Sequence, residues 1–165
     1  KWIRYERRHS LTAVHIDWYY DPVKELHALP VIDDASRKML SLVEVESATT
    51  EASIEAMKVA LQHGKIKQCI TDHGTQFWKG KGKKCRFAKF LIEQGIKHIL
   101  CRIKHPQSNG KSEKFNDLYK NHRHAFRTKE EFMHWYNEVR PHRSLKFEEL
   151  ETPQQAFMRK MKAEV

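Results

Sequence analysis

Residues 65–77, KIKQCITDHGTQF, combine a short apolar run with an abrupt polar ending. The apolar part is bounded on both sides, which is typical of a buried strand, and we place that strand at residues 66–72. A helical pattern of apolar residues precedes it at 49–64, and a second one follows it at 85–95. Another short apolar run, 96–101, comes directly afterwards. Two successive strand–helix–strand steps predict parallel neighbouring strands with right-handed crossovers.

Three further strand-like runs come before this unit. Residues 11–20, 25–34 and 37–47 are rich in aliphatic and aromatic side chains, and Pro22 marks a turn between the first two. We read them as a three-stranded antiparallel meander. With the two parallel strands, they predict an α/β fold in which a five-stranded mixed sheet carries helices on both faces.

Helical patterns return in the last third of the chain, at 109–125, at 128–139 and from Thr152 onward. We therefore expect a core over residues 11–127 and a C-terminal helical extension, 128–165, packed on that core. The first ten residues, KWIRYERRHS, are basic and do not begin with methionine. We interpret residues 1–10 as the remnant of a linker in a longer protein.

The chain is strongly basic. It has 31 Lys and Arg against 21 Asp and Glu, a formal net charge of +10 over 165 residues. Such a surplus indicates a polyanionic partner, because phosphate neutralisation supplies most of the sequence-independent affinity for nucleic acid. No apolar stretch approaches the roughly 18 residues that a membrane span needs, so we expect no membrane partner.

The three cysteines, Cys69, Cys85 and Cys101, are too scattered for a disulfide scaffold, and they lack the spacing of a zinc site. We expect reduced, mostly buried thiols. That cysteine usage is typical of an intracellular protein, here one in the cytoplasm or associated with the nucleoid.

Three acidic residues occupy positions where a carboxylate calls for an explanation. Asp17 lies inside the first apolar run, where a charge is costly unless a partner compensates it. Asp72 ends a predicted parallel strand, and ligands collect at the carboxyl ends of such strands. Glu113 lies on a predicted helix, on the side opposite its apolar residues. A plain structural role stays open for each: a solvated strand face, a turn residue and a solvated helix face, respectively.

Asp33 and Asp34 form another acidic pair, within the stretch DDASR. This stretch has ordinary turn chemistry, because Asp and Ser side chains bond to nearby backbone groups. We assign both residues to the turn before the third strand rather than to a site.

Four motifs occur in order along the chain: HIDW (15–18), TDHGTQF (71–77), HPQSNGKSE (105–113) and YNEVRPHRSL (136–145). Together they resemble the catalytic core of retroviral-integrase-like proteins, particularly insertion-sequence transposases, and the resemblance extends from about His15 to Phe157. It implies a ribonuclease H-like fold and an Asp-Asp-Glu metal triad. Matched motif by motif, that triad falls on Asp17, Asp72 and Glu113.

Two features depart from the family pattern. The triad intervals are 55 and 41 residues, and the second is a few residues longer than usual. The surplus fits in the Gly- and Lys-rich segment 78–87, because the entropic cost of lengthening a loop grows only logarithmically. His73 stands where the family more often has Asn, so it either keeps the motif's supporting hydrogen bonds or adds a pH dependence.

The resemblance implies a DDE-type polynucleotidyl transferase that cleaves DNA and transfers strands, as in integration, recombination and transposition. Clustered carboxylates are hard oxygen donors that suit Mg²⁺ or Mn²⁺. Two such ions, about 3.5–4 Å apart, can activate the attacking oxygen and stabilise the leaving one. The expected partners are DNA, as element ends and a target duplex, and further copies of the chain in a homodimer or higher homo-oligomer.

Basic and polar residues near the triad are the candidate DNA contacts. Backbone N–H groups at the start of the helix that carries the glutamate can hold a phosphate, and lysines around the acids can bind the DNA backbone. The candidates are Lys79, Lys81, Lys83, Lys84, Ser108, Asn109, Gly110, Lys111, Lys114, Lys120, Arg140 and Arg143. Surface loops and solvated helix faces are the plain alternatives, and the two arginines could instead hold the C-terminal helix to the sheet. His73, Gly74 and His105 are supporting candidates.

Two other functions stay open. A nuclease on the same fold, such as a resolvase or a ribonuclease, would share the carboxylates but not the HPQSNGKSE and RPH segments. A transposase-derived DNA-binding module without catalysis would bind DNA and give no divalent-dependent product.

Overall fold

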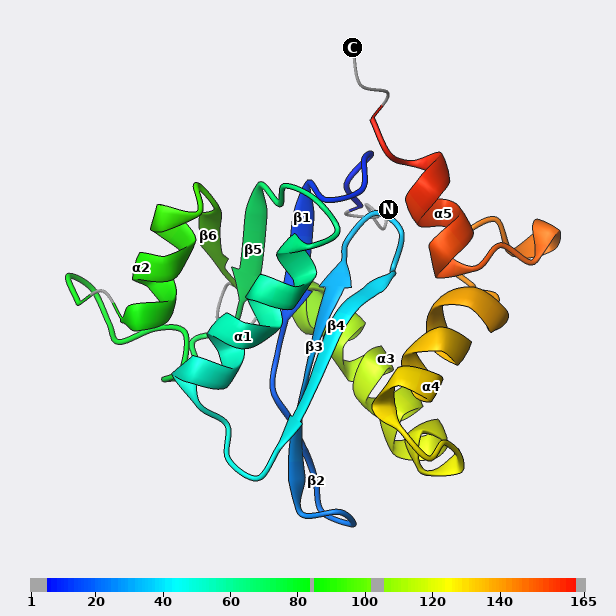
Figure 1. Cartoon of the computed structure of the whole chain (residues 1–165). Helices are drawn as coiled ribbons and strands as arrows, with labels where there is room; N and C mark the ends of the chain where they lie inside the picture. Colours follow the sequence, from blue (N-terminus) through cyan, green and yellow to red (C-terminus); the bar gives the residue numbers. More distant parts are fainter. Residues whose placement is uncertain (1–5, 84, 102–105, 163–165) are drawn as a thin grey trace.

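The central strand–helix–strand unit has the predicted order. In a computed structural model, which describes residues 6–83, 85–101 and 106–162, the chain runs through α1 (Thr50–Leu61), β5 (Gln68–Thr71), α2 (Arg86–Glu93) and β6 (Lys97–Leu100) (Figure 1). β5 pairs in parallel with β1 (Ala13–Ile16) on one side and with β6 on the other. The expected parallel neighbours are thus confirmed. For residues 106–109 the description covers the helical backbone alone.

The sheet has six strands rather than the predicted five. The first apolar run is divided into β1 and β2 (Tyr19–Asp21), and both pair antiparallel with the long strand β3 (Leu26–Asp33). Asp17 therefore lies between two strands and not inside one. Apolar periodicity could not show this interruption, which leaves the carboxylate-bearing residue outside the β-ladder. β4 (Met39–Val45) pairs with β3 and completes the sheet.

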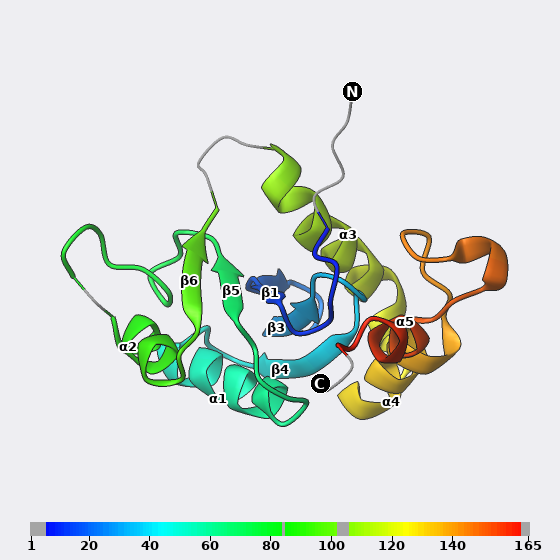
Figure 2. The same cartoon turned by 90° about the horizontal axis from the view of Figure 1, so that it is seen from above.

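Helices cover both faces of the sheet, as predicted. In the view from above, α1 and α2 lie on one side and α3 (Pro106–His122) lies on the other (Figure 2). A first apolar core joins β1, β3 and β4 to α1 and α2 through side chains such as Leu29, Met57 and Leu91. A second core joins β3 and β4 to α3 and α4 (Lys129–His134), through Phe115, Tyr119 and Phe132 among others.

The helical pattern predicted at 128–139 forms two kinds of helix. After α4 the backbone widens into a π-helical segment, η2 (Trp135–Val139). There the side-chain amide of buried Asn137 accepts from the backbone N–H of Met39 and donates to its carbonyl oxygen, both at 2.9 Å. Such widened turns occur where a side chain needs an unusual direction, which sequence periodicity does not encode.

The other helical segments follow the predicted order. α3 begins at Pro106, three residues before the predicted start, and proline is well tolerated in the first turn of a helix. Short 3₁₀ turns follow at η1 (Arg123–Ala125) and η3 (Phe147–Glu149), and the last helix is α5 (Pro153–Arg159), capped by Thr152 as expected.

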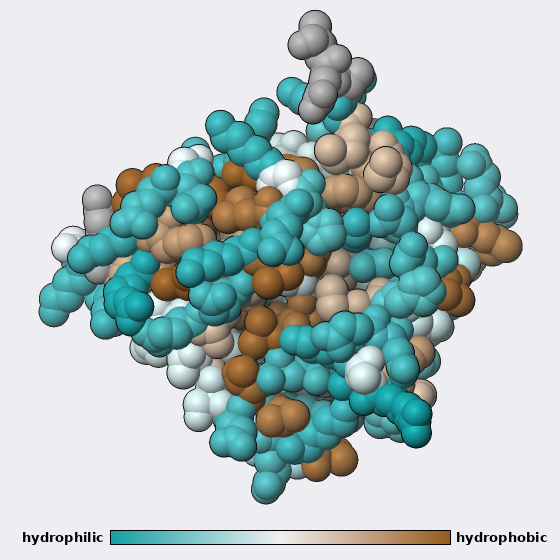
Figure 3. Space-filling model, in the orientation of Figure 1, coloured by the Kyte–Doolittle hydropathy of each residue, from teal (hydrophilic) through white to brown (hydrophobic). Residues whose placement is uncertain are grey.

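Hydrophilic side chains dominate the surface that carries α1 and β4, with apolar groups showing between them (Figure 3). Among the described residues, no helix is both long enough and apolar enough to cross a membrane. Cys69 and Cys85 are buried, Cys101 is half-buried, and all three are free thiols.

A buried ion pair ties the end of α3 to β4. The guanidinium of Arg123 donates to both carboxylate oxygens of Glu44, at 2.6 and 3.0 Å, and the hydroxyl of Tyr119 donates to the same carboxylate at 2.7 Å. We expect Arg123→Met to lower the free energy of unfolding by about 1.5–3 kcal/mol, because it removes the cation from a largely buried carboxylate that keeps only the hydrogen bond from Tyr119. Urea denaturation measures this change.

Arg86→Met is the matched control. Arg86 pairs with Glu51 across the surface, and the two side chains are 69% and 59% exposed. Its loss should therefore cost less than about 1 kcal/mol. Equal effects of the two substitutions would contradict the structural role assigned to the Glu44–Arg123 pair.

Candidate functional site

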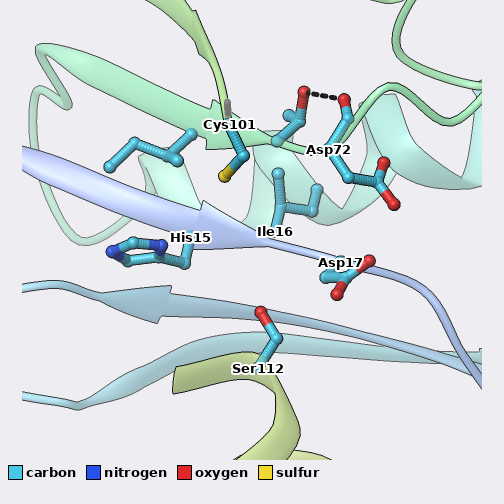
Figure 4. A pocket seen from close by; sticks show the side chains of 8 residues that line it. His15, Ile16, Asp17, Asp72, Cys101 and Ser112 are labelled. Atoms are coloured by element: carbon cyan, nitrogen blue, oxygen red, sulfur yellow. Dashed lines mark hydrogen bonds between the residues drawn. The ribbon is translucent and has the colours of Figure 1, made fainter. Parts of the chain in front are cut away.

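Asp17 and Asp72 are brought together by the register of two parallel strands. β1 and β5 pair Ala13 with Gln68, Val14 with Cys69 and His15 with Ile70, always 55 residues apart. Asp17 and Asp72 have the same separation in the sequence and follow the carboxyl ends of these strands. Continuation of the register therefore places one acid opposite the other, and in Figure 4 the two carboxylates lie near each other.

The two acids line a small pocket. Its walls come from the ends of β1 and β5, from Cys101 after β6 and from Ser112 on α3. In Figure 4, Ser112 approaches Asp17 from the helix side. The volume is about 10 Å³, close to what a single water molecule needs. The pocket thus has room for one small polar species beside the carboxylates.

Burial and repulsion act together on Asp17. Its desolvation, followed by the charge of Asp72 and a hydrogen bond between the two side chains, raises the pKa of Asp17 from 3.8 to about 7. A hydrogen bond with Ser112 acts in the opposite direction but is outweighed. The same two acids, after burial, raise the pKa of the Cys101 thiol. At neutral pH this cluster therefore retains protons unless a cation compensates its charge.

Asp72 is oriented by its own turn. The backbone N–H of Gly74 donates to Asp72 Oδ1 at 2.8 Å. A Cβ atom on Gly74 would lie 2.9 Å from that oxygen, too close for an undisturbed contact. Glycine at this position therefore permits the close approach that fixes the carboxylate. Thr71 also stabilises the turn, because its hydroxyl donates to the Asp72 carbonyl oxygen at 2.9 Å.

Glu113 does not join the two aspartates in this structure. It follows Ser112 on α3, but its side chain is exposed and does not line the pocket. In the described part of the chain, no group of three or more His, Cys, Asp or Glu side chains is close enough to hold a metal ion. The helix nevertheless brings the Glu113 backbone to the edge of the pocket, because consecutive Cα atoms are only about 3.8 Å apart.

The predicted DNA contacts occupy several kinds of surface. Exposed positions hold Lys79, Lys81, Lys83, Lys114, Lys120 and Arg143. Lys111 is different, because its ammonium group pairs with the buried carboxylate of Asp34. Gly110 is half-buried at the start of the described part of α3. Lys84 and His105 lie outside the described residues, and Ser108 and Asn109 are described only by their helical backbone.

The segment after the core holds Arg140 against aromatic rings. Its guanidinium carbon lies 4.7 Å from the ring centre of Tyr136 and 5.8 Å from that of Trp135. The ring contacts do not decide between the two alternatives for Arg140, because its buried Nε and Nη2 have no hydrogen-bond partner among the described residues. His73 is exposed beside Asp72 and makes an edge contact with Trp78, with ring centres 6.4 Å apart.

Three contributors were missed by sequence reasoning. Ser112 is part of the HPQSNGKSE motif, but only its neighbour Glu113 was predicted to be a site residue. Cys101 was predicted only to be a reduced, mostly buried thiol, although it comes directly after a parallel strand, where ligands collect. Asp34 was assigned to a turn, and nothing in DDASR indicates that its carboxylate also reaches α3.

The fold and the pocket correspond to a known class. Family models described as "integrase core domain" match residues 7–106 and residues 94–148. The chain therefore belongs to the integrase core domain family.

Two proteins are similar to this chain in sequence. A proposed integrase of Spiroplasma virus SpV1-C74 is 29% identical over 76% of this chain, which spans 41% of that protein's length. An uncharacterised protein of Archaeoglobus fulgidus is 30% identical, and the match covers 59% of this chain and 78% of that protein's length.

Two solved structures with a similar fold come from retroviral integrases. A chain of the simian T-cell lymphotropic virus intasome, solved in complex with the PP2A regulatory subunit B56 gamma, has a TM-score of 0.72 at 14% identity and covers 93% of this chain and 56% of its own. The catalytic core domain of BIV integrase has a TM-score of 0.67 at 14% identity, and the match covers 93% of this chain and 95% of the BIV chain. The predicted ribonuclease H-like fold is thus confirmed.

The raised pKa of Asp17 predicts a pH-dependent stability in metal-free buffer. The folded protein holds the Asp17 proton more tightly than the unfolded chain does. This proton therefore stabilises the folded state fully below about pH 4, and the stabilisation is lost as the pH rises through about 7. Asp17→Asn should raise Tm relative to the parent protein by roughly 5 °C or more at pH 8. The gain should be smaller at pH 5 and should disappear near pH 3.

Thermal unfolding in EDTA at the three pH values measures this difference. Asp117→Asn, an exposed position on α3, is the control and should leave Tm unchanged throughout. A gain for Asp17→Asn that does not vary with pH would contradict the coupling between the two acids.

Proposed function

We propose that this chain is an integrase or transposase catalytic core that cuts DNA and joins DNA strands with Mg²⁺ or Mn²⁺. The observation that carries the proposal is the convergence of Asp17 and Asp72 at the carboxyl ends of two parallel strands, in a pocket of one-water size. Membership of the integrase core domain family supports the same reaction class.

The residues at this pocket fit a divalent cation. Two carboxylates within hydrogen-bonding range of each other form a negative, oxygen-rich site, and hard cations such as Mg²⁺ prefer oxygen donors. The Cys101 thiol stays neutral, because burial and then the two acids raise its pKa, so it does not compete as a soft ligand. Asp17 and Asp72 would hold the ion, and Glu113 would complete its oxygen ligands from α3.

A bound ion of this kind would supply charge stabilisation and an activated attacking oxygen. The protein's own residues orient the groups around it. Gly74 and Thr71 fix Asp72, while Ser112 contacts Asp17 from α3. In the proposed reaction, the oxygen of water or of a DNA 3′-hydroxyl forms a bond to phosphorus, and the opposite phosphorus–oxygen bond breaks in line.

DNA is the proposed partner. Exposed lysines at positions 79, 81 and 83 follow Asp72 in the chain, and Lys114 and Lys120 extend from α3. Such side chains neutralise phosphates and release counterions, which gives affinity without sequence specificity. We also propose that the chain acts as a homodimer or higher homo-oligomer, because the two ends of one DNA element take part in the same reaction.

We expect Asp72→Asn to abolish strand joining while the protein remains folded. A catalytic metal supplies several kcal/mol of transition-state stabilisation, and each 1.4 kcal/mol is tenfold in rate. The joining rate should therefore fall by about 100-fold or more. Pre-cut DNA ends, a target duplex and Mg²⁺ or Mn²⁺ provide the assay, and calorimetric titration of Mn²⁺ measures binding independently of turnover.

Asp117→Asn is the matched control, an Asp-to-Asn exchange at an exposed position of α3, and should leave Mn²⁺ binding and joining at the parent level. Cut but unjoined DNA would identify a nuclease on the same fold. Binding of DNA without Mn²⁺ binding or product would identify an inactive DNA-binding module. Either outcome, or parent-level joining by Asp72→Asn, contradicts the proposal.

A further inference from the structure

Asp34 is a buried charge at the meeting point of four segments. Its side chain is 5% exposed, and its Oδ1 lies 2.7 Å from His15 Nε2 on β1 and 3.6 Å from the guanidinium of Arg37 in the following turn. Its Oδ2 accepts from the backbone N–H of Arg7 at 2.7 Å. The ammonium group of Lys111, on α3, donates to Oδ1.

These partners keep Asp34 ionised. Burial by itself favours the protonated form, but the hydrogen bond with His15 and the charge of Lys111 hold the pKa of Asp34 well below its usual range. An ionised carboxylate in this position is costly to leave unpaired. Lys111 is the partner named above that lies on α3, so its ion pair with Asp34 constrains where the early turns of that helix can lie.

Lys111 occupies a critical position on that helix. It comes directly before Ser112, which contacts Asp17, and two residues before Glu113. The apolar anchors of α3 begin further along, at Phe115 and Tyr119 in the second core. Within the described side chains of α3, Lys111 and Ser112 are thus the polar links between its early turns and the sheet.

We propose that Lys111 is a positioning residue whose ion pair with Asp34 holds the early turns of α3 beside β1, and so keeps Glu113 within reach of Asp17 and Asp72. This inference rests on the proposed function and deepens it. It assigns to Lys111 a role in metal affinity rather than a contact with DNA.

Burial distinguishes Lys111 from the other lysines of the helix. Its side chain is 29% exposed and faces a carboxylate, whereas Lys114 and Lys120 are exposed. A phosphate at Lys111 would have to share the ammonium with the carboxylate of Asp34, and the negative charge of that carboxylate disfavours it. In this inference Lys111 anchors α3, whereas the exposed Lys114 and Lys120 are the residues of the helix that contact DNA.

The test compares metal affinity with DNA affinity in Lys111→Met. We expect Mn²⁺ binding, measured by calorimetry, to weaken by about 10-fold, the low end of the loss seen when residues that orient metal ligands are removed, because Lys111 acts on Glu113 through the helix and not by direct contact. DNA affinity, measured by fluorescence anisotropy in EDTA, should stay within about twofold. Asp34→Asn should reproduce the metal effect, and the double variant should be no weaker than the weaker single one, because both changes break one interaction.

Two further variants sharpen the comparison. Lys111→Arg keeps a cation on Asp34 and should retain most of the Mn²⁺ affinity. Lys114→Met removes an exposed charge from the same helix and should weaken DNA binding without changing Mn²⁺ binding. Circular dichroism confirms folding, and Lys111→Gln, which keeps a donor for Asp34, replaces Lys111→Met if that variant does not fold.

Unchanged Mn²⁺ affinity in Lys111→Met together with weaker DNA binding would overturn the inference and make Lys111 a DNA contact. Additive losses in the double variant would also overturn it. Amide hydrogen exchange over residues 110–115 of the metal-free protein separates this inference from the proposed function. If the parent protein binds no Mn²⁺, the proposed function fails, but the positioning role still predicts faster amide exchange over residues 110–115 in Lys111→Met than in the parent. Unchanged amide exchange would contradict the positioning role itself.

Discussion

The parallel pairing of β1 with β5 is the constraint on which the site depends. Every pair in that ladder is separated by 55 residues, and this offset carries Asp17 and Asp72 to the same level at the carboxyl ends of the strands. A register slip would separate the two acids and also turn buried side chains toward the other face of the sheet. Because Val14, Ile16 and Cys69 are fully buried or nearly so, the core resists such a slip. The packing of apolar residues thereby maintains a polar arrangement that is unfavourable by itself.

The second side of the site has a different physical basis. Asp17 and Asp72 are placed by hydrogen bonds between strands, whereas Glu113 depends on a helix that crosses the opposite face of the sheet. That helix is fixed in its middle by Phe115 and toward its far end by Tyr119 and the Glu44–Arg123 pair. Nearer the pocket it is held by charge, through Lys111 and Asp34. A strongly basic protein thus uses buried acids to position its helices.

Much of this could be predicted from the sequence, because the signals were local. The run around Cys69 and Ile70 predicted a parallel strand, and Thr152 with Pro153 predicted the start of the last helix. That Asp17 and Asp72 share one site was implied by the motif resemblance and not by periodicity, because the pattern placed Asp17 inside a strand of the antiparallel meander. The break between β1 and β2, the π-helical turn at Asn137 and the role of Asp34 could not be predicted, because each depends on a partner far away in the chain. Glu113 shows the same limit, since helical periodicity places its backbone but does not decide where its side chain points.

The most direct test of the account is a crystal structure of the protein with Mn²⁺, recorded at a wavelength that reveals the metal by anomalous scattering. The account predicts a peak between the carboxylates of Asp17 and Asp72, with the Glu113 side chain turned from solvent toward it. A well-ordered pocket without a peak at a Mn²⁺ concentration that supports joining, or a peak bound by other residues, would contradict it.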